Sequence, residues 1–160
     1  MLDHPVDGYV EIPDNLIDIK PWTDQHLAGR LIVTPKAARA AKVSVFSEPQ
    51  LAYRAMLLLA NSYRTTRTKG DETARFRFEE GLKELGLRNE PSGEETRLRE
   101  KGEEFLVRWE GRKRLLDWHL KNGGKTRDPR RCFRLYYFWD DEKQIVVLGS
   151  LPGHLTTRQA

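Results

Sequence analysis

The stretch that most constrains the fold is residues 132–148, where two strand-like runs flank an acidic turn. Residues 132–139 (CFRLYYFW) are rich in aromatic side chains, and residues 144–148 (QIVVL) are almost wholly apolar. Aromatic and β-branched residues suit a pleated backbone, and a short unbroken apolar run is typical of a strand at the centre of a sheet. We therefore predict an antiparallel hairpin whose turn is residues 140–143.

Two amphipathic helices are predicted upstream, over residues 48–66 and 71–87. In the first, apolar side chains recur at spacings of three and four residues, which makes a wide stripe suited to core packing. Ser47 and Gln50 have the spacing of a capping box, and Gly86 can end the second helix in a left-handed conformation. With the polar, basic stretch 64–70 as their connector, the two helices are expected to form a helical hairpin.

The predicted fold class is α+β, with the helical hairpin packed on a small antiparallel β-sheet of up to four strands at residues 103–149. From residue 103 the apolar period changes to two, which indicates a strand to residue 109 before the turn signal Glu110-Gly111. Residues 112–120 fit either a strand or a helix, and residues 89–102 are the predicted hinge. Residues 1–47, interrupted by prolines, are expected to be an N-terminal extension that packs on the body at residues 48–160; runs at 31–33 and 43–46 are candidate strands within it.

The charge distribution suggests a polyanionic partner. The chain of 160 residues has a formal net charge of +4, but the window 108–134 holds ten basic and three acidic residues, a local excess of +7. Such an excess attracts phosphates over roughly 10 Å at moderate salt. A basic face that is merely solvated fits the same composition.

Composition argues against several other classes. No run of 18 apolar residues occurs, and residues 1–14 lack the basic-then-apolar pattern of a secretory signal, so we expect no membrane association and a cytoplasmic location. The single cysteine, Cys132, is predicted to be a buried, inert thiol. The sequence has no P-loop, dinucleotide fingerprint, nucleophile elbow or zinc-finger spacing, so neither a metal nor a cofactor is expected.

Candidate functional side chains lie between residues 114 and 154. His154 follows Leu151-Pro152-Gly153, where an imidazole could exchange a proton with a phosphodiester or simply bond to its own loop. Arg134 could stabilise a pentacovalent phosphate or only solvate a strand face. Asp117, His119 and Lys121 would share one face of a strand. An RNA backbone could be held by His119 and by a set of basic residues, namely Arg114, Lys121, Lys125, Arg127, Arg130 and Arg131, and its bases could stack on Tyr136, Tyr137 and Trp139 if these are not core residues.

The stretch FRLYYFWDDEKQIVVLGSLPGHL resembles the C-terminal half of the RelE/ParE toxin superfamily, with its basic run, Arg-led aromatic strand, acidic turn, apolar strand and terminal histidine. The resemblance covers about residues 112–155 and implies a helical hairpin on an antiparallel sheet. For RelE-like members it implies cleavage of ribosome-bound mRNA without a metal. It places Arg134 at the family's strand arginine, His154 at the terminal histidine and Arg131 in the RNA-contacting run. Leu155 stands where some members have a tyrosine, and Asp117 is only near the region of their acidic base.

Three functional hypotheses are compatible with these residues. The first is a RelE-like metal-independent RNA endonuclease of a toxin–antitoxin system, with His154, Arg134 and Asp117 as the catalytic set. The second is a non-catalytic module that binds nucleic acid or protein through residues 108–134. The third is an accessory protein of a mobile-element or defence system whose basic face is only solvated. The expected partners are RNA or the ribosome, and a protein such as an antitoxin.

Overall fold

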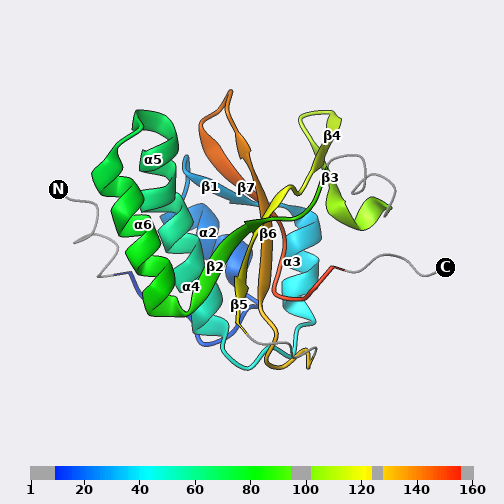
Figure 1. Cartoon of the computed structure of the whole chain (residues 1–160). Helices are drawn as coiled ribbons and strands as arrows, with labels where there is room; N and C mark the ends of the chain where they lie inside the picture. The colour runs from blue at the N-terminus through cyan, green and yellow to red at the C-terminus, as the bar shows by residue number, and fades with distance from the viewer. Residues whose placement is uncertain (1–9, 95–101, 124–127, 156–160) are drawn as a thin grey trace.

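In the computed structural model, residues 10–94, 102–123 and 128–155 are described, and they form the expected α+β fold (Figure 1). The main sheet has five strands in the order β1-β7-β6-β5-β2, and β3 and β4 make a separate two-stranded ribbon. Neighbouring strands pair antiparallel except β1, which runs parallel to β7. The strands are β1 (Leu31–Val33), β2 (Leu87–Pro91), β3 (Leu106–Trp109), β4 (Arg112–Leu115), β5 (Trp118–Asn122), β6 (Arg134–Asp140) and β7 (Ile145–Ser150).

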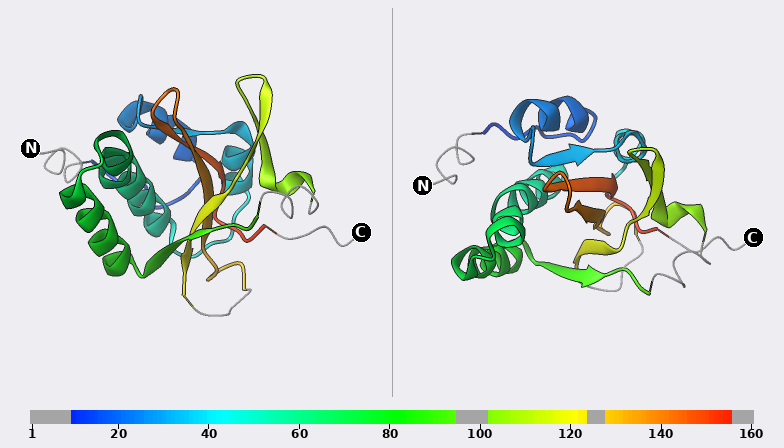
Figure 2. Two further views of the ribbon diagram at one scale, coloured as in Figure 1. Left: turned by 45° about the horizontal axis from the view of Figure 1, so that its top comes forward. Right: turned by 90° about the horizontal axis from the view of Figure 1, so that it is seen from above.

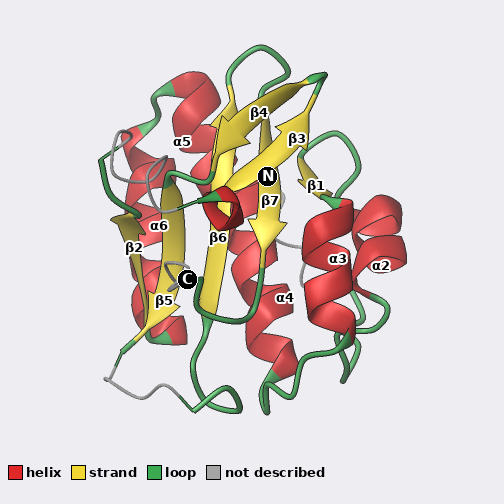
Figure 3. Cartoon of the chain, turned by 90° about the vertical axis from the view of Figure 1, so that its right-hand side faces the viewer, coloured by secondary structure: helices red, strands yellow, loops and turns green. Residues whose placement is uncertain are grey.

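The helices cover one face of this sheet and flank its β1 edge. In Figures 2 and 3, α4, α5 and α6 lie on one side of the sheet, the β3–β4 ribbon lies on the other, and α2 and α3 lie beside β1. The predicted helical hairpin is therefore present. The helical elements are α2 (Ile19–His26), α3 (Pro35–Lys42), α4 (Pro49–Leu58), the π-helix η1 (Leu59–Tyr63), α5 (Arg64–Lys69), α6 (Glu72–Leu85) and the 3₁₀-helix η2 (Glu103–Phe105).

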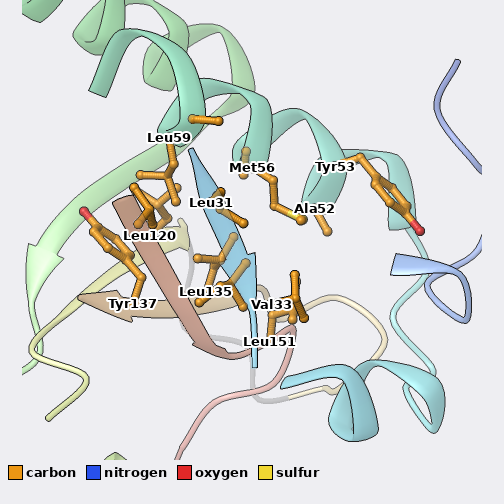
Figure 4. Packing of buried hydrophobic residues seen from close by; sticks show 14 of the residues in the cluster. Leu31, Val33, Ala52, Tyr53, Met56, Leu59, Leu120, Leu135, Tyr137 and Leu151 are labelled. Atoms are coloured by element: carbon orange, nitrogen blue, oxygen red, sulfur yellow. The ribbon is translucent and has the colours of Figure 1, made fainter. Parts of the chain in front are cut away.

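The larger core fills the space between the helices and the sheet. Met56 and Leu59 point from the helical layer toward Leu120, Leu135 and Tyr137, and all five are fully buried (Figure 4). Because side chains alternate across a strand, this layer takes every second residue of β5 and β6. The other residues of those two strands are left for the opposite face.

A second, smaller core lies under the ribbon on that opposite face. Phe105 and Val107 pack there with Leu116 from the segment before β5, and Tyr136 and Phe138 come from β6. The phenyl ring of Phe105 meets the ring of Tyr136 edge-on, with centroids 5.7 Å apart. All of β6 is consequently buried, with the helices on one side and the ribbon over much of the other.

The predicted connector over residues 64–70 is helical as far as Lys69, so the first helix continues past residue 66, where it was predicted to end. The chain continues from α4 through η1 into α5 and turns only at Gly70, whose φ of 62° is left-handed. Tertiary contacts hold this polar segment: Arg64 Nε donates to Gln144 O at 2.8 Å, and the Arg67 guanidinium lies 5.5 Å from the centroid of the Trp139 ring.

The predicted helix ends are partly confirmed. Gly86 ends α6 with a φ of 71°, as expected. The capping box at Ser47 is wrong, because Glu48 is the N-cap of α4 and makes no side-chain cap bond. Ser47 instead donates its hydroxyl to Arg130 O at 2.7 Å, 83 positions away in sequence. A tertiary bond has thus taken the place of a local one.

The main sheet includes strands from outside residues 103–149, the range predicted for it. It also contains β1 at the candidate strand 31–33 and β2 at residues 87–91, which overlaps the start of the predicted hinge at residues 89–102. Residues 43–46 form no strand. The ambiguous segment 112–120 is divided between β4 and β5, and the strand that ends at Trp109 belongs to the ribbon rather than to the main sheet.

Two turns agree with the sequence. Glu110 and Gly111 join β3 to β4 with left-handed φ values of 53° and 79°, the backbone of a tight hairpin turn. In the turn after β6, Asp140 Oδ1 accepts hydrogen bonds from the backbone N–H groups of Glu142 and Lys143. Within the described ranges, no helix combines the length and apolar character that crossing a bilayer requires.

Candidate functional site

Strands β5 and β6 bring the candidate histidine and arginine to one face of the sheet. In their antiparallel register His119 lies opposite Tyr136, and Lys121 lies opposite Arg134. The alternate residues, such as Leu120, pack toward the helices. His119, Lys121 and Arg134 therefore share the face that carries the ribbon. Together with His154 they are called the sheet-face cluster below.

Arg134 is held rigidly within this cluster. The residue is only 8% exposed, and its Nη1 donates to Phe133 O at 2.7 Å and to Asn122 Oδ1 at 3.2 Å. Asn122 Oδ1 also accepts from Phe133 N at 3.1 Å, and Asn122 Nδ2 donates to Arg131 O at 2.8 Å. The Asn122 amide thus orients the Arg134 guanidinium and joins the end of β5 to Arg131 in the loop before β6.

His119 is half-buried between neighbours that disfavour its charged form. Its ring stacks on Tyr136 with centroids 5.0 Å apart, and its Nδ1 lies 3.2 Å from Ser92 Oγ. Burial, followed by the charges of Arg134 and Lys121, lowers the pKa of His119 to about 4. The imidazole is therefore neutral near pH 7.

One carboxylate borders the cluster from β2. Glu90 lies opposite His119 in the register, and its charge raises the pKa of that histidine against the larger lowering effects. Glu90 Oε1 lies 3.8 Å from Lys121 Nζ, and its other oxygen lies 3.5 Å from Arg88 Nε. Because Lys121 and Arg88 share the single negative charge of Glu90, this carboxylate does not cancel the positive charge of the cluster.

The segment after β7 brings His154 to the same place. Arg134 N donates to Pro152 O at 2.8 Å, and Leu155 N donates to the Tyr136 hydroxyl at 3.2 Å, so the segment is fixed to β6 on both sides of His154. His154 itself is exposed, and its charge contributes to the lowered pKa of His119. Two of the three residues predicted to be catalytic, Arg134 and His154, thus lie close enough to His119 for their charges to lower its pKa.

Two other candidates lie elsewhere. Asp117 is exposed just before β5, and its charge raises the pKa of Tyr63 and Tyr137, whose rings lie in the helix-facing core. Because β5 begins only at Trp118, strand alternation does not place Asp117, and its sharing a face with His119 and Lys121 stays a prediction. Arg114 lies under the ribbon instead, with its guanidinium 4.2 Å from the centroid of the Phe138 ring.

The basic loop before β6 presents Arg130 and Arg131 to solvent. Its backbone is anchored at Arg130 O, which accepts from the backbone N and the hydroxyl of Ser47 at 2.9 and 2.7 Å. Arg130 Nε lies 3.5 Å from Asp128 Oδ1, an exposed pair of small energetic weight. Lys125 and Arg127, the other predicted contacts, lie outside the described residues.

Several interpretations of single residues are now decided. Tyr136, Tyr137 and Trp139 are buried core residues, which leaves them little surface for stacking on bases. Cys132 is a buried thiol, as predicted. Ser92 and Asn122 had no predicted role, because their segments contain the turn-forming pairs Ser92-Gly93 and Gly123-Gly124 and resembled plain loops. Only the tertiary structure places them against His119 and Arg134.

In chemical terms, the cluster combines a neutral imidazole, a second histidine and two fixed cations beside a basic loop. That set can attract a phosphate and exchange protons with it. Within the described ranges, no group of three or more His, Cys, Asp and Glu side chains is placed to hold a metal ion. Comparisons of the chain with models of known protein families, with curated proteins and with solved structures find no match.

Proposed function

We propose that the protein binds RNA at the sheet-face cluster and cleaves it by a metal-independent transesterification. The observation that carries this proposal is the placement of a neutral His119 beside the charges of Arg134 and Lys121. A neutral imidazole can accept a proton, and neighbouring cations stabilise the negative charge that develops at phosphorus.

Each residue has a defined step in this chemistry. In the tautomer whose Nδ1–H donates to Ser92 Oγ, the Nε2 atom of His119 accepts the proton of a ribose 2′-hydroxyl. The 2′-oxygen then attacks the phosphorus, the bond from phosphorus to the 5′-oxygen breaks, and a 2′,3′-cyclic phosphate forms. His154 in its protonated form donates a proton to the leaving 5′-oxygen. Asn122 and Ser92 act as positioning residues.

The sequence resemblance to the RelE/ParE superfamily supports the same proposal independently. It associates Arg134 with the family's strand arginine and His154 with its terminal histidine, and the charges of both residues act on His119. The observed α+β class, a helical hairpin on a sheet, is the one that the resemblance implies. RNA, free or on the ribosome, is the proposed substrate, and a protein partner such as an antitoxin stays a prediction.

A second candidate function is RNA or protein binding without cleavage. The observation in its favour is that Arg134 is 8% exposed and that its Nη1 is engaged by two protein oxygens. Such an arginine acts through its charge rather than through a fork of bonds to phosphate.

The deciding experiment measures cleavage of single-stranded RNA in EDTA by wild-type protein and by His119→Ala and His154→Ala variants. We expect cleavage by the wild type and a loss of about 10²–10⁴-fold in each variant, the usual contribution of general acid–base catalysis. His26→Ala is the matched control, because this histidine lies at the end of α2 and contacts Trp22.

Two outcomes would contradict the proposal, one for the residue roles and one for catalysis itself. Cleavage that is unchanged in both variants would remove the assigned roles. RNA binding that weakens steeply with salt, but without any turnover, would instead establish the non-catalytic module.

A further inference from the structure

A cavity of about 330 Å³ opens beside the sheet-face cluster. Three segments line it: the one after α3, the start of the basic loop, and the one after β7. Its walls are mainly apolar, and those relevant here are Val43, Val45, Pro129, Leu151, Pro152 and His154. His154 therefore belongs both to this cavity and to the cluster.

Two apolar side chains of the cavity wall are exposed to solvent. Val43 is 80% exposed and Val45 is 59% exposed, and both side chains line the cavity. Burying them against a ligand would be favourable, at about 25 cal/mol for each Å² of apolar surface. These two valines thus form an apolar rim next to a strongly polar cluster.

Hydrogen bonds hold the walls in fixed positions. Ser44 Oγ accepts from Phe46 N at 2.9 Å, which shapes the segment that carries Val43 and Val45. Ser47 N donates to Arg130 O at 2.9 Å and so joins this wall to the part of the loop before β6 that contains Pro129. The third wall is tied to β6 through Pro152 O. A ligand would meet a preformed site rather than order one.

We infer that this cavity receives one nucleobase of the RNA strand whose phosphate lies at the sheet-face cluster; the inference rests on the proposed function. Ligand sites span about 300–1,000 Å³, so this cavity suits one small planar group rather than a helix. The faces of Val45, Pro129 and Pro152 offer the apolar contact that a base requires. The cations Arg130 and Arg131 follow Pro129 directly and can meet the adjoining backbone.

The test uses short single-stranded RNAs that lack one base at successive positions. For wild-type protein we expect one position at which loss of the base weakens binding by about tenfold, because the base no longer covers the apolar wall of the cavity. The double variant Val43→Ser/Val45→Ser should weaken the intact RNA by a similar factor. It should cause no further loss for the RNA that lacks that base, because the same contact cannot be lost twice.

The matched control is Ile17→Ser/Phe76→Ser, since these side chains are 58% and 62% exposed and do not line the cavity. It should bind every RNA as the wild type does. If the valine variant binds the intact RNA normally, the cavity serves another ligand, such as a protein segment, and the inference is overturned while the proposed function stands. If the wild type binds no RNA, both fail together.

Discussion

His119 shows how a single residue acquires its chemistry from its neighbours. In the sequence it is one of four histidines, and its only distinguishing feature is its alternation with Asp117 and Lys121. In the fold it lies against Tyr136, next to Arg134 and Lys121, and its pKa falls to about 4 from an ordinary value of 6.5. A proton on this ring would lose hydration and meet like charges, which is the physical reason for the shift.

This shift predicts a specific loss of stability in acid. Between about pH 6.5 and about pH 4 the unfolded chain binds a proton at His119 that the folded protein does not, so the free energy of unfolding is undiminished above this range and falls within it. After allowance for solvent screening of the half-exposed ring, we expect a loss of about 1–2 kcal/mol.

The measurement is urea unfolding at about pH 7.5 and about pH 4.5 for the wild type and for His119→Gln, which cannot titrate. The wild type should lose more stability than the variant between the two values. Equal losses would show that His119 has an ordinary pKa in the folded protein.

Among the elements, the β3–β4 ribbon depends on the packing beneath it. Gly149 in β7 lies where an added Cβ would be 2.3 Å from Leu116 Cδ2 and 3.0 Å from Val107 Cγ1. The glycine therefore permits the ribbon and the segment before β5 to approach the sheet. From the sequence alone, Gly149 is only a residue of low strand propensity, because the side chains that it contacts are more than thirty positions away.

Gly149→Ala should consequently destabilise the protein by about 1–3 kcal/mol, the usual cost of overpacking a core. The comparison is Gly153→Ala, because nothing lies within 4 Å of a Cβ at that position. Chemical denaturation of both variants checks the difference. Similar midpoints for the two would mean that the ribbon does not pack tightly on β7.

Across the whole molecule, the segment before α4 completes the sheet. Leu31 and Val33 of β1 are buried in the main core, and β1 pairs with β7 from Leu31↔Val146 to Val33↔Leu148. Thr34 N continues the pairing by donating to Leu148 O at 3.0 Å. The strand thus covers an edge that would otherwise present unpaired backbone groups.

Removal of residues 1–42 should therefore abolish cooperative folding rather than trim a dispensable extension. The truncated chain would expose Val146 and Leu148 along with an unpaired strand, and we expect aggregation. Size-exclusion chromatography and urea unfolding, beside the full chain, test this. A monomeric truncated protein with an unchanged unfolding midpoint would contradict the structural role given to β1.

Local sequence pattern determined much of this fold. The α+β class, the helical hairpin, the left-handed stop at Gly86, the turn at Glu110-Gly111 and the hairpin formed by β6 and β7 all depend on neighbours close in sequence. Propensity, periodicity and turn chemistry act over that range, so the sequence reveals them. Among the site candidates, it singled out His119, Lys121, Arg134 and His154 in the same way.

Only the tertiary structure decided how those residues meet. The helical state of residues 64–69, the bond from Ser47 to Arg130 and the parallel strand β1 all depend on contacts between distant segments. The lowered pKa of His119 has the same origin, since burial and the charge of Arg134 exist only once β5 and β6 pair. Local pattern supplies the groups, and long-range packing sets their distances, their charge states and the surface that they share.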